Sequence, residues 1–169
     1  GLSATAFPSG VYGSQVEVTE STAPLLIHRR ELRPDSGGAG RYRGGLGQII
    51  EVESHEGQAF DFFGTVDRVK YPARGCFGGG DGAPGQLALR SGKRMQGKGK
   101  QPIPAGESLI FQTPGGGGYG DPRKRAPAEV ARDYAAGLIS RKALRRVYLV
   151  CLKPDGRVDL PATRELRRT

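Results

Sequence analysis

Residues 114–122 read PGGGGYGDP, and they join the last predicted strand, 107–113, to the first predicted helix, which begins near Ala126. Four consecutive glycines carry no side chains, so they adopt positive φ freely and let another backbone or a ligand approach closely. They also lose more conformational entropy on folding than other residues do. A chain that keeps them either follows an unusual backbone path at this point or is loose there.

Two further glycine clusters precede this one, DSGGAGRYRGGLG at 35–47 and GCFGGGDGAPG at 75–85. The 169-residue chain holds 28 glycines and 12 prolines, which could indicate low complexity. However, the glycines are clustered and periodic segments lie between the clusters, so we predict an ordered chain. The expected fold class is α+β: mainly β with glycine-rich loops, plus a short C-terminal helical region.

Alternating or short apolar segments bounded by turn residues are typical of strands. This pattern predicts strands at 15–20, 25–33, 48–54, 58–64, 65–71, 86–90 and 107–113. Because only 55–57 separate two of them, strands 48–54 and 58–64 are expected to pair as a hairpin. Residues 91–100 are expected to be an exposed loop, and 102–107 a turn.

The pattern becomes helical after residue 122. Pro127 suits a first helical turn, Gly137 a helix C-cap, and Ser140 the N-cap of a second helix over 141–147. A buried strand at 148–152 is expected next, with 158–160 pairing back, followed by a basic helix over 161–169. We therefore predict a glycine-rich β body, 1–122, and a helical tail with a short strand, 123–169.

Composition restricts the classes of partner. The net charge is +9, and much of the excess lies in the tail without interleaved aromatic residues, so a solvated or partner-facing helical surface is favoured over a nucleic-acid site. The hydrophobic content of 36% is thin for an independent core, so the chain either has a small core with long loops or buries part of its surface against a partner. Cys76 and Cys151 form no CxxC motif, and no membrane segment or signal peptide is visible. These features fit a cytoplasmic protein without a metal site of its own.

The glycine clusters also supply the candidate site residues. Arg41 and Arg43 lie in the first cluster and could hold a phosphate or carboxylate, although the cluster matches neither a P-loop nor a Rossmann loop. The alternative is that Arg–carboxylate pairs pin this loop, with Asp35 as the nearest partner. The remaining candidates, suited to close backbone approach, are Gly115, Gly116, Gly117, Gly118 and Tyr119. No Ser/His/Asp, Cys/His or HExxH constellation is present.

Several stretches resemble the C-terminal part of the B-type subunit of the hydantoinase/5-oxoprolinase family. They are 1–10, 30–47, Asp67-Arg68 with Pro72 and Gly75, residues 114–122, and tail positions from Arg132 to Tyr148. The resemblance implies ATP-dependent opening of cyclic amides such as hydantoins or 5-oxoproline, or the related carboxylation of ketones such as acetone and acetophenone. Phosphorylation of an amide or enolate oxygen by ATP creates a good leaving group for such a reaction.

The resemblance also implies partners. An A-type, actin-like ATPase subunit would carry ATP with Mg, and the rest of the B-type subunit would carry any metal and the substrate ligands. This chain corresponds to roughly the last third of a B-type subunit. We therefore expect no cofactor in this chain, a hetero-oligomer, no nucleic acid or membrane partner, and no activity of the chain alone. The alternative is a non-catalytic structural or assembly module of such a complex.

Overall fold

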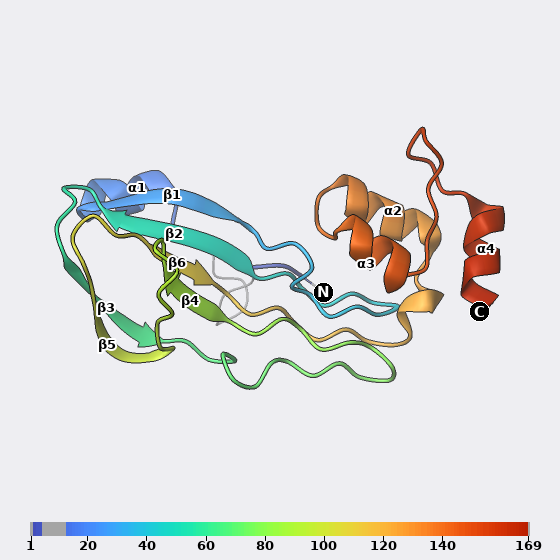
Figure 1. Cartoon of the computed structure of the whole chain (residues 1–169), viewed down its shortest axis with the longest axis horizontal. Coiled ribbons are helices and arrows are strands. Elements are labelled where there is room, and N and C mark those ends of the chain that lie inside the picture. The colour runs from blue at the N-terminus through green and yellow to red at the C-terminus, as the bar shows by residue number, and fades with distance from the viewer. Residues whose placement is uncertain (1, 5–12, 169) are drawn as a thin grey trace.

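The computed structural model describes residues 2–4 and 13–168. Residues 1, 5–12 and 169, which include most of the family-like opening stretch and the predicted end of the last helix, lie outside the described residues. Strands lie at one end of the molecule and helices α2–α4 at the other, and extended glycine-rich segments connect them (Figure 1). The predicted α+β, mainly β class is confirmed.

Two antiparallel sheets form the β end. The larger contains β1 (Leu25–Leu32), β2 (Gln48–Ser54), β6 (Leu109–Gln112) and β4 (Gln86–Leu89), in the order β1-β2-β6-β4. The smaller pairs β3 (Phe60–Thr65) with β5 (Lys98–Ile103). The predicted strands at 25–33, 48–54, 86–90 and 107–113 are thus confirmed to within a few residues.

The predicted hairpin between 48–54 and 58–64 is wrong. Strand β2 pairs with β1 and β6, whereas Phe60 at the start of β3 pairs with Ile103 of β5. Ile103 is fully buried, and Phe60 and Phe62 pack with it against Leu89 and Leu109. Burial of the phenylalanine face therefore decides the pairing. Residues 66–71 are not a strand, and 98–103, expected to be loop and turn, form β5.

The predicted strand at 15–20 is also wrong, because Val16–Thr22 form helix α1. Its partly buried residues are Val16, Thr19 and Glu20, which fall on one helical face rather than alternating. The Glu20 carboxylate accepts a hydrogen bond from Ile27 N at 2.7 Å, so the helix is tied to β1. Tertiary contact thus overrides the β propensity of a short segment.

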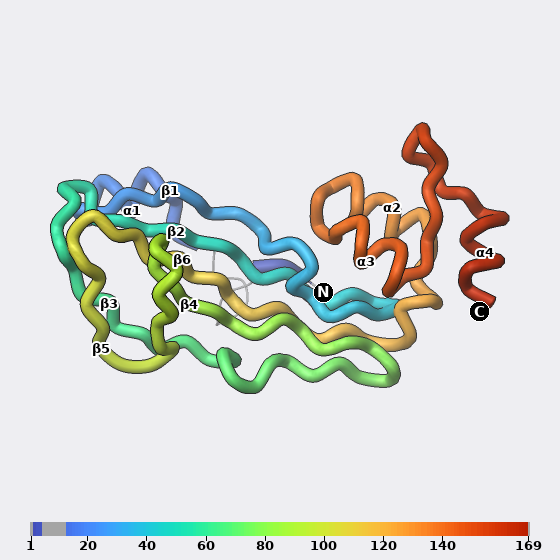
Figure 2. Tube along the Cα trace, viewed as in Figure 1, coloured from blue at the N-terminus to red at the C-terminus, as the bar shows by residue number. Residues whose placement is uncertain are grey.

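Three glycine-rich segments, 36–47, 73–85 and 113–120, run side by side from the sheet toward the helices, and we call them the glycine bundle (Figure 2). Backbone groups join them: Gly38 N donates to Gly116 O at 2.8 Å, Gly80 N to Ala39 O at 2.7 Å, and Gly118 N to Gly80 O at 2.9 Å. A Cβ at Gly38, Gly79 or Gly118 would overlap the backbone of a neighbouring segment. As at the axis of collagen, only glycine fits at such spacing.

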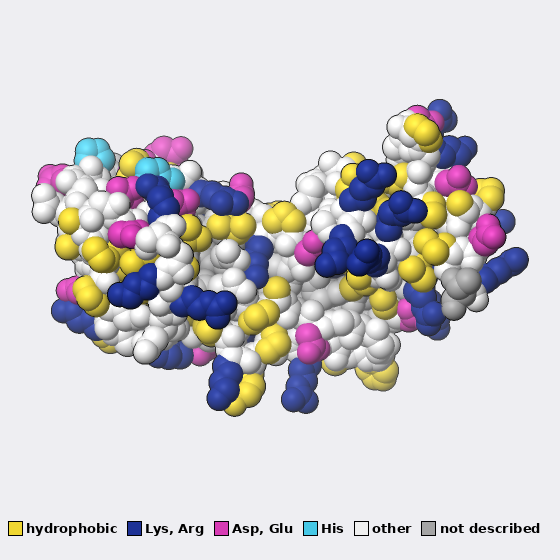
Figure 3. Space-filling view, in the orientation of Figure 1, with side chains coloured by type: hydrophobic (Ala, Val, Ile, Leu, Met, Phe, Trp, Pro, Cys, Tyr) yellow, Lys and Arg dark blue, Asp and Glu magenta, His cyan; other side chains and the backbone are white. Residues whose placement is uncertain are grey.

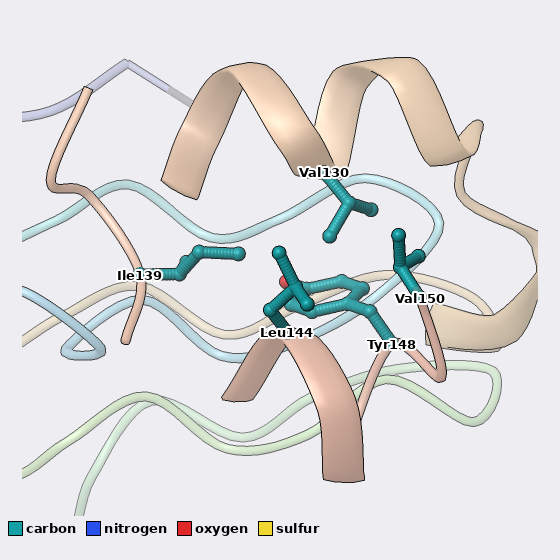
Figure 4. Close-up of a cluster of buried hydrophobic side chains, with 5 residues drawn as sticks. All are labelled: Val130, Ile139, Leu144, Tyr148 and Val150. Atoms are coloured by element: carbon teal, nitrogen blue, oxygen red, sulfur yellow. The ribbon is translucent and has the colours of Figure 1, made fainter. Parts of the chain in front are cut away.

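The tail contains a 3-10 turn (Pro122–Lys124), α2 (Pro127–Ala135), α3 (Arg141–Arg146) and α4 (Leu160–Arg168). The predicted caps are confirmed: Ser140 Oγ accepts from Ala143 N at 3.1 Å, and Gly137 has φ +70°. Five buried residues converge to form what we call the helical cluster (Figure 4). They are Val130, Ile139, Leu144, Tyr148 and Val150.

Residues 148–152 are buried in part but do not form the predicted strand. Leu149 has φ +51°, which interrupts extended pairing, and only Leu152 bridges to Val158, where the predicted return pairing occurs. Ala39 of the glycine bundle packs against the helical cluster, so the two parts share an interface. Among the described residues, no helix combines the length and apolar character needed to cross a membrane.

Candidate functional site at the end of the glycine bundle

The three segments of the glycine bundle meet at Tyr42, Cys76 and Tyr119, far from the sheet. Tyr42 N donates to Tyr119 O at 3.0 Å, and Tyr119 N returns a bond to Tyr42 O at 2.9 Å. Cys76 N donates to Gly118 O at 2.9 Å, and Cys76 bridges to Tyr119 in parallel. The backbone therefore fixes the side chains that leave this end of the bundle.

Those side chains form an exposed aromatic cluster, which we call the aromatic tip and define as Tyr42, Phe77 and Tyr119. The ring centroids of Phe77 and Tyr119 are 5.1 Å apart, and those of Tyr42 and Tyr119 are 6.2 Å apart. The exposed fractions are 58% for Tyr42, 81% for Phe77 and 50% for Tyr119. Such a contiguous apolar cluster on a surface is typical of a contact site rather than of chance exposure.

Phe77 is held outward by an uncommon backbone conformation. Its φ is +51°, a region that few residues other than glycine, asparagine and aspartate adopt. Strain of this kind persists where surrounding structure enforces it, and it often accompanies function. The neighbouring bond from Gly79 N to Cys76 O, at 3.0 Å, closes the turn that carries Phe77. The structure therefore presents this ring to solvent by a rigid turn.

Arg41 lies at the aromatic tip. Its guanidinium carbon is 5.5 Å from the centroid of the Tyr42 ring, within cation–π range, and its backbone N donates to Gly120 O at 3.0 Å. The side chain is exposed. Of the two predicted arginines, Arg41 is thus the one placed to meet an anionic group from outside.

Arg43 points inward instead. Its Nε donates to the Asp133 carboxylate at 3.2 Å, and Arg125 Nη2 donates to the same oxygen at 3.0 Å. All three side chains are at most 14% exposed, and we call them the arginine clamp. The expectation that Asp35 would pair with a loop arginine is wrong, because Asp35 accepts from Ser140 N at 2.8 Å. Helix α2 brings Asp133 to the bundle, which local sequence could not reveal.

Tyr148 lies buried within reach of this clamp. Burial raises the pKa of the Tyr148 hydroxyl, while the charges of Arg125 and Arg43 act in the opposite direction. The tyrosine is therefore neutral at physiological pH. Arg167 of α4 adds a further tie, donating through Nη2 to Tyr148 O at 3.0 Å and to Arg125 O at 3.0 Å. The clamp thus joins the bundle to both ends of the tail.

The four consecutive glycines lie inside the bundle. Gly115 and Gly118 are buried, and Gly116 and Gly117 are half-buried. A Cβ would overlap Ser36 O at Gly115, Arg74 O at Gly117 and Ala39 O at Gly118. The close backbone approach expected of these glycines is therefore made by other segments of the same chain.

Sequence reasoning named Arg41 and Tyr119 but missed Phe77, Tyr42 and Asp133. The sequence did carry a signal for Phe77 and Tyr42, namely an aromatic residue within a glycine-rich loop. Such a residue has few neighbouring side chains against which it can be buried. Nothing in the local sequence marks Asp133. Within residues 2–4 and 13–168, no group of three or more His, Cys, Asp or Glu side chains is placed to hold a metal ion.

A model of the hydantoinase B/oxoprolinase family matches residues 1–122, and the chain therefore belongs to that family. It is 33% identical over 159 residues to the B-type component of a putative D-/L-hydantoinase from Pseudomonas sp. (strain NS671), covering 90% of this chain and 26% of that protein. The crystal structure of the ATP-dependent caprolactamase from Pseudomonas jessenii matches with a TM-score of 0.73 and 32% identity, covering 93% of this chain and 28% of that one.

The fold also matches that of nucleotide-free acetone carboxylase, with a TM-score of 0.68 and 24% identity over 99% of this chain and 28% of that one. The chain thus spans about a quarter of the length of each of these three relatives. The relatives of this chain include proteins named as subunits, namely the hydantoinase component above, the beta subunit of caprolactamase and the delta subunit of acetophenone carboxylase.

Proposed function

We propose that this chain is the C-terminal part, or a small subunit, of the B-type component of an ATP-dependent cyclic-amide hydrolase of the hydantoinase/5-oxoprolinase type, or of a related ketone carboxylase. The observation that carries the proposal is the match to the ATP-dependent caprolactamase structure over 93% of this chain. Caprolactam is a cyclic amide, as hydantoins and 5-oxoproline are. The activity belongs to the whole assembly, since the chain spans only about a quarter of that structure's chain.

In this proposal the assembly is hetero-oligomeric. An A-type, actin-like ATPase subunit holds ATP with Mg and phosphorylates the substrate, and the rest of the B-type subunit holds any metal and completes the reaction. This chain supplies a body, 1–122, and a helical tail, 123–169, which acts as a second unit. The end of the family match at residue 122 supports that division.

Within the assembly, the aromatic tip is the surface that meets the other chains or the substrate channel. Arg41 contacts an anionic group there, and Tyr119 provides a flat apolar surface beside it. The tip is held in a fixed position on the glycine bundle by Gly115, Gly116, Gly117 and Gly118. Arg43 holds the bundle against the tail. The geometry supports these roles because Arg41 and Tyr119 are exposed together, whereas the glycines and Arg43 are enclosed.

The first test is Arg41→Ala in the complete complex, with ATP hydrolysis measured against hydantoin, 5-oxoproline, caprolactam and acetone. Loss of a charge-assisted contact of about 1.5–3 kcal/mol would lower substrate-dependent turnover by roughly 10- to 100-fold. Arg94→Ala, an exposed cation between β4 and β5, is the matched control and should leave turnover unchanged. If Arg41→Ala assembles and turns over like the wild type, the role assigned to Arg41 is wrong. If none of these substrates stimulates ATP hydrolysis by the wild-type complex, the proposed function is wrong.

A second candidate is a non-catalytic assembly module. It is favoured by the exposed aromatic tip. Phe77→Ser separates the two, because it removes the most exposed ring without touching the bundle's backbone bonds. An assembly module predicts less complex but full activity per assembled complex; a substrate-facing tip predicts normal assembly with reduced turnover.

A further inference from the structure

Helix α3 presents a dense patch of positive charge. Its six residues include four exposed cations, Arg141, Lys142, Arg145 and Arg146. None of them takes part in a salt bridge within the part of the chain that the structure describes, although eleven such pairs occur elsewhere. Lys and Arg side chains gather visibly over α3 (Figure 3). The patch is thus uncompensated by the described residues of this chain.

This arrangement opposes helix formation. Arg141 with Arg145, and Lys142 with Arg146, are like-charged pairs at i,i+4, each of which costs about 0.2–0.5 kcal/mol in a helix. The negative C-terminal end of the helix favours Arg145 and Arg146 and offsets part of that cost. Buried Leu144 and the Ser140 cap hold the helix in place despite the repulsion. The carboxylates of an acidic partner would offset this repulsion by pairing with the same cations.

A groove lies beside the patch, between α3 and residues 151–156, with a volume of about 530 Å³. Its apolar floor includes Tyr134, Leu144, Cys151 and Leu152. Its rim carries Arg141, Arg145 and Lys153, and no acidic side chain of the described residues lines it. We call this the basic groove. Asp155 is close enough to Lys153 for the lysine charge to lower the pKa of its carboxyl group. That carboxylate already accepts a hydrogen bond from Arg157 Nε at 2.8 Å.

We propose that the basic groove docks an acidic segment of a protein partner, with its carboxylates on Arg141 and Arg145 and an apolar side chain against Tyr134 and Leu152. Arginine guanidinium groups match carboxylates in a two-pronged geometry. The apolar floor favours a peptide over inorganic phosphate. The uncompensated rim sets the sign of the partner's charge. The inference rests on the proposed function, which supplies the complex. It adds which surface of this chain binds the partner and the acidic character of the partner segment.

The size of the relatives fits such a partner segment. This chain spans 26–28% of the hydantoinase and caprolactamase chains that it matches, so a B-type component has ample further chain to supply one. A single-stranded nucleic acid is a poorer occupant, because it requires exposed aromatic residues on which bases stack. Tyr134, the aromatic residue of the groove, is half-buried.

The first experiment reverses the rim charge in the complete complex, Arg141→Glu with Arg145→Glu. The control is Lys93→Glu with Arg94→Glu, two exposed cations between β4 and β5. Complex retained on size exclusion is measured at several salt concentrations. We expect at least about tenfold weaker association for the groove variant, with the salt dependence lost, because screening acts on the charges removed. Arg141→Gln with Arg145→Gln relieves the helix repulsion and provides a variant that folds, for which weaker association is also expected.

The second experiment identifies the contact directly. Zero-length carbodiimide coupling joins a lysine amine to a touching carboxylate, and Lys153 lies on the rim of the basic groove. We expect Lys153, but not Lys93, to couple to Asp or Glu residues outside this chain. Unchanged association of both groove variants, or coupling of Lys153 only within this chain, would overturn the inference while an active complex leaves the proposed function standing. Retention of DNA or RNA at physiological salt through the groove would also overturn it, and the absence of any wild-type complex would overturn both.

Discussion

The glycine bundle and the helical cluster pack against each other, yet one is held together by backbone groups and the other by side chains. In the bundle, extended segments approach until carbonyl and amide groups touch, as where Gly118 N meets Gly80 O at 2.9 Å. In the cluster, Val130, Tyr148 and Val150 are each at most 1% exposed and fill the space between helices. The two regions therefore depend on different kinds of fit.

The difference has an energetic consequence. Burial of side chains stabilises the helical cluster in proportion to apolar area, and such a core adjusts when a methyl group is removed. The glycine bundle gains about 0.5–1.5 kcal/mol for each net hydrogen bond and buries little apolar side chain. Its backbone atoms have no rotamers with which to adjust. We therefore expect the bundle to reject added volume sharply and the cluster to lose stability gradually.

The largest effect is expected from Gly118→Ala. The new Cβ would overlap Ala39 O and lie 2.6 Å from Ala39 C, and all of these neighbours are backbone. Thermal unfolding should show a loss beyond the usual ~1–3 kcal/mol for overpacking, or no cooperative transition. Gly80→Ala is the matched control, since its Cβ would meet Ala39 N at an ordinary 3.5 Å. Equal melting temperatures for the two variants would show that the bundle is not sterically closed.

A smaller loss is expected from Asp133→Asn, which breaks the arginine clamp between the two regions. Removal of the carboxylate leaves the enclosed Arg125 guanidinium with only the Glu129 carboxylate, 3.6 Å away, and takes from Arg43 the carboxylate that its Nε contacts, at a cost of about 3 kcal/mol. The free energy of unfolding from urea titration measures it. Asp155→Asn, whose partner Arg157 is 85% exposed, should cost far less, because solvent screens an exposed ion pair. If both variants lose the same small amount, the clamp does not join the regions energetically.

The smallest loss is expected from Ile139→Val in the helical cluster. Ile139 is 4% exposed, and removal of one methylene from such a core costs about 0.5–1.5 kcal/mol. For a domain of this size, that lowers the melting temperature by roughly 1–6 °C. Calorimetry measures the melting temperatures of Ile139→Val and Gly118→Ala side by side. The first variant removes one methylene from a side-chain core, and the second adds one methyl group between packed backbones. A larger loss in Ile139→Val would reverse the contrast between the two regions.

The sequence by itself determined the features that depend on neighbouring residues. Strand β2 falls at the predicted residues because its alternation and flanking turns are local, and Ser140 and Gly137 mark helix ends through their own hydrogen bonds and backbone freedom. The glycine clusters identified the segments that would need close backbone approach. Together they carried the family resemblance that the family match over 1–122 bears out.

Only the tertiary structure decided which distant segments meet. Burial of Ile103 placed β3 beside β5 rather than β2, and contact with β1 made 16–22 a helix despite its β-like alternation. The partnership of Arg43 with Asp133 and the gathering of Tyr42, Phe77 and Tyr119 join residues that lie 35 to 90 positions apart. Local propensity contributes tenths of a kilocalorie per residue, whereas burial and ion pairing across the fold contribute whole kilocalories, so the latter determine these placements.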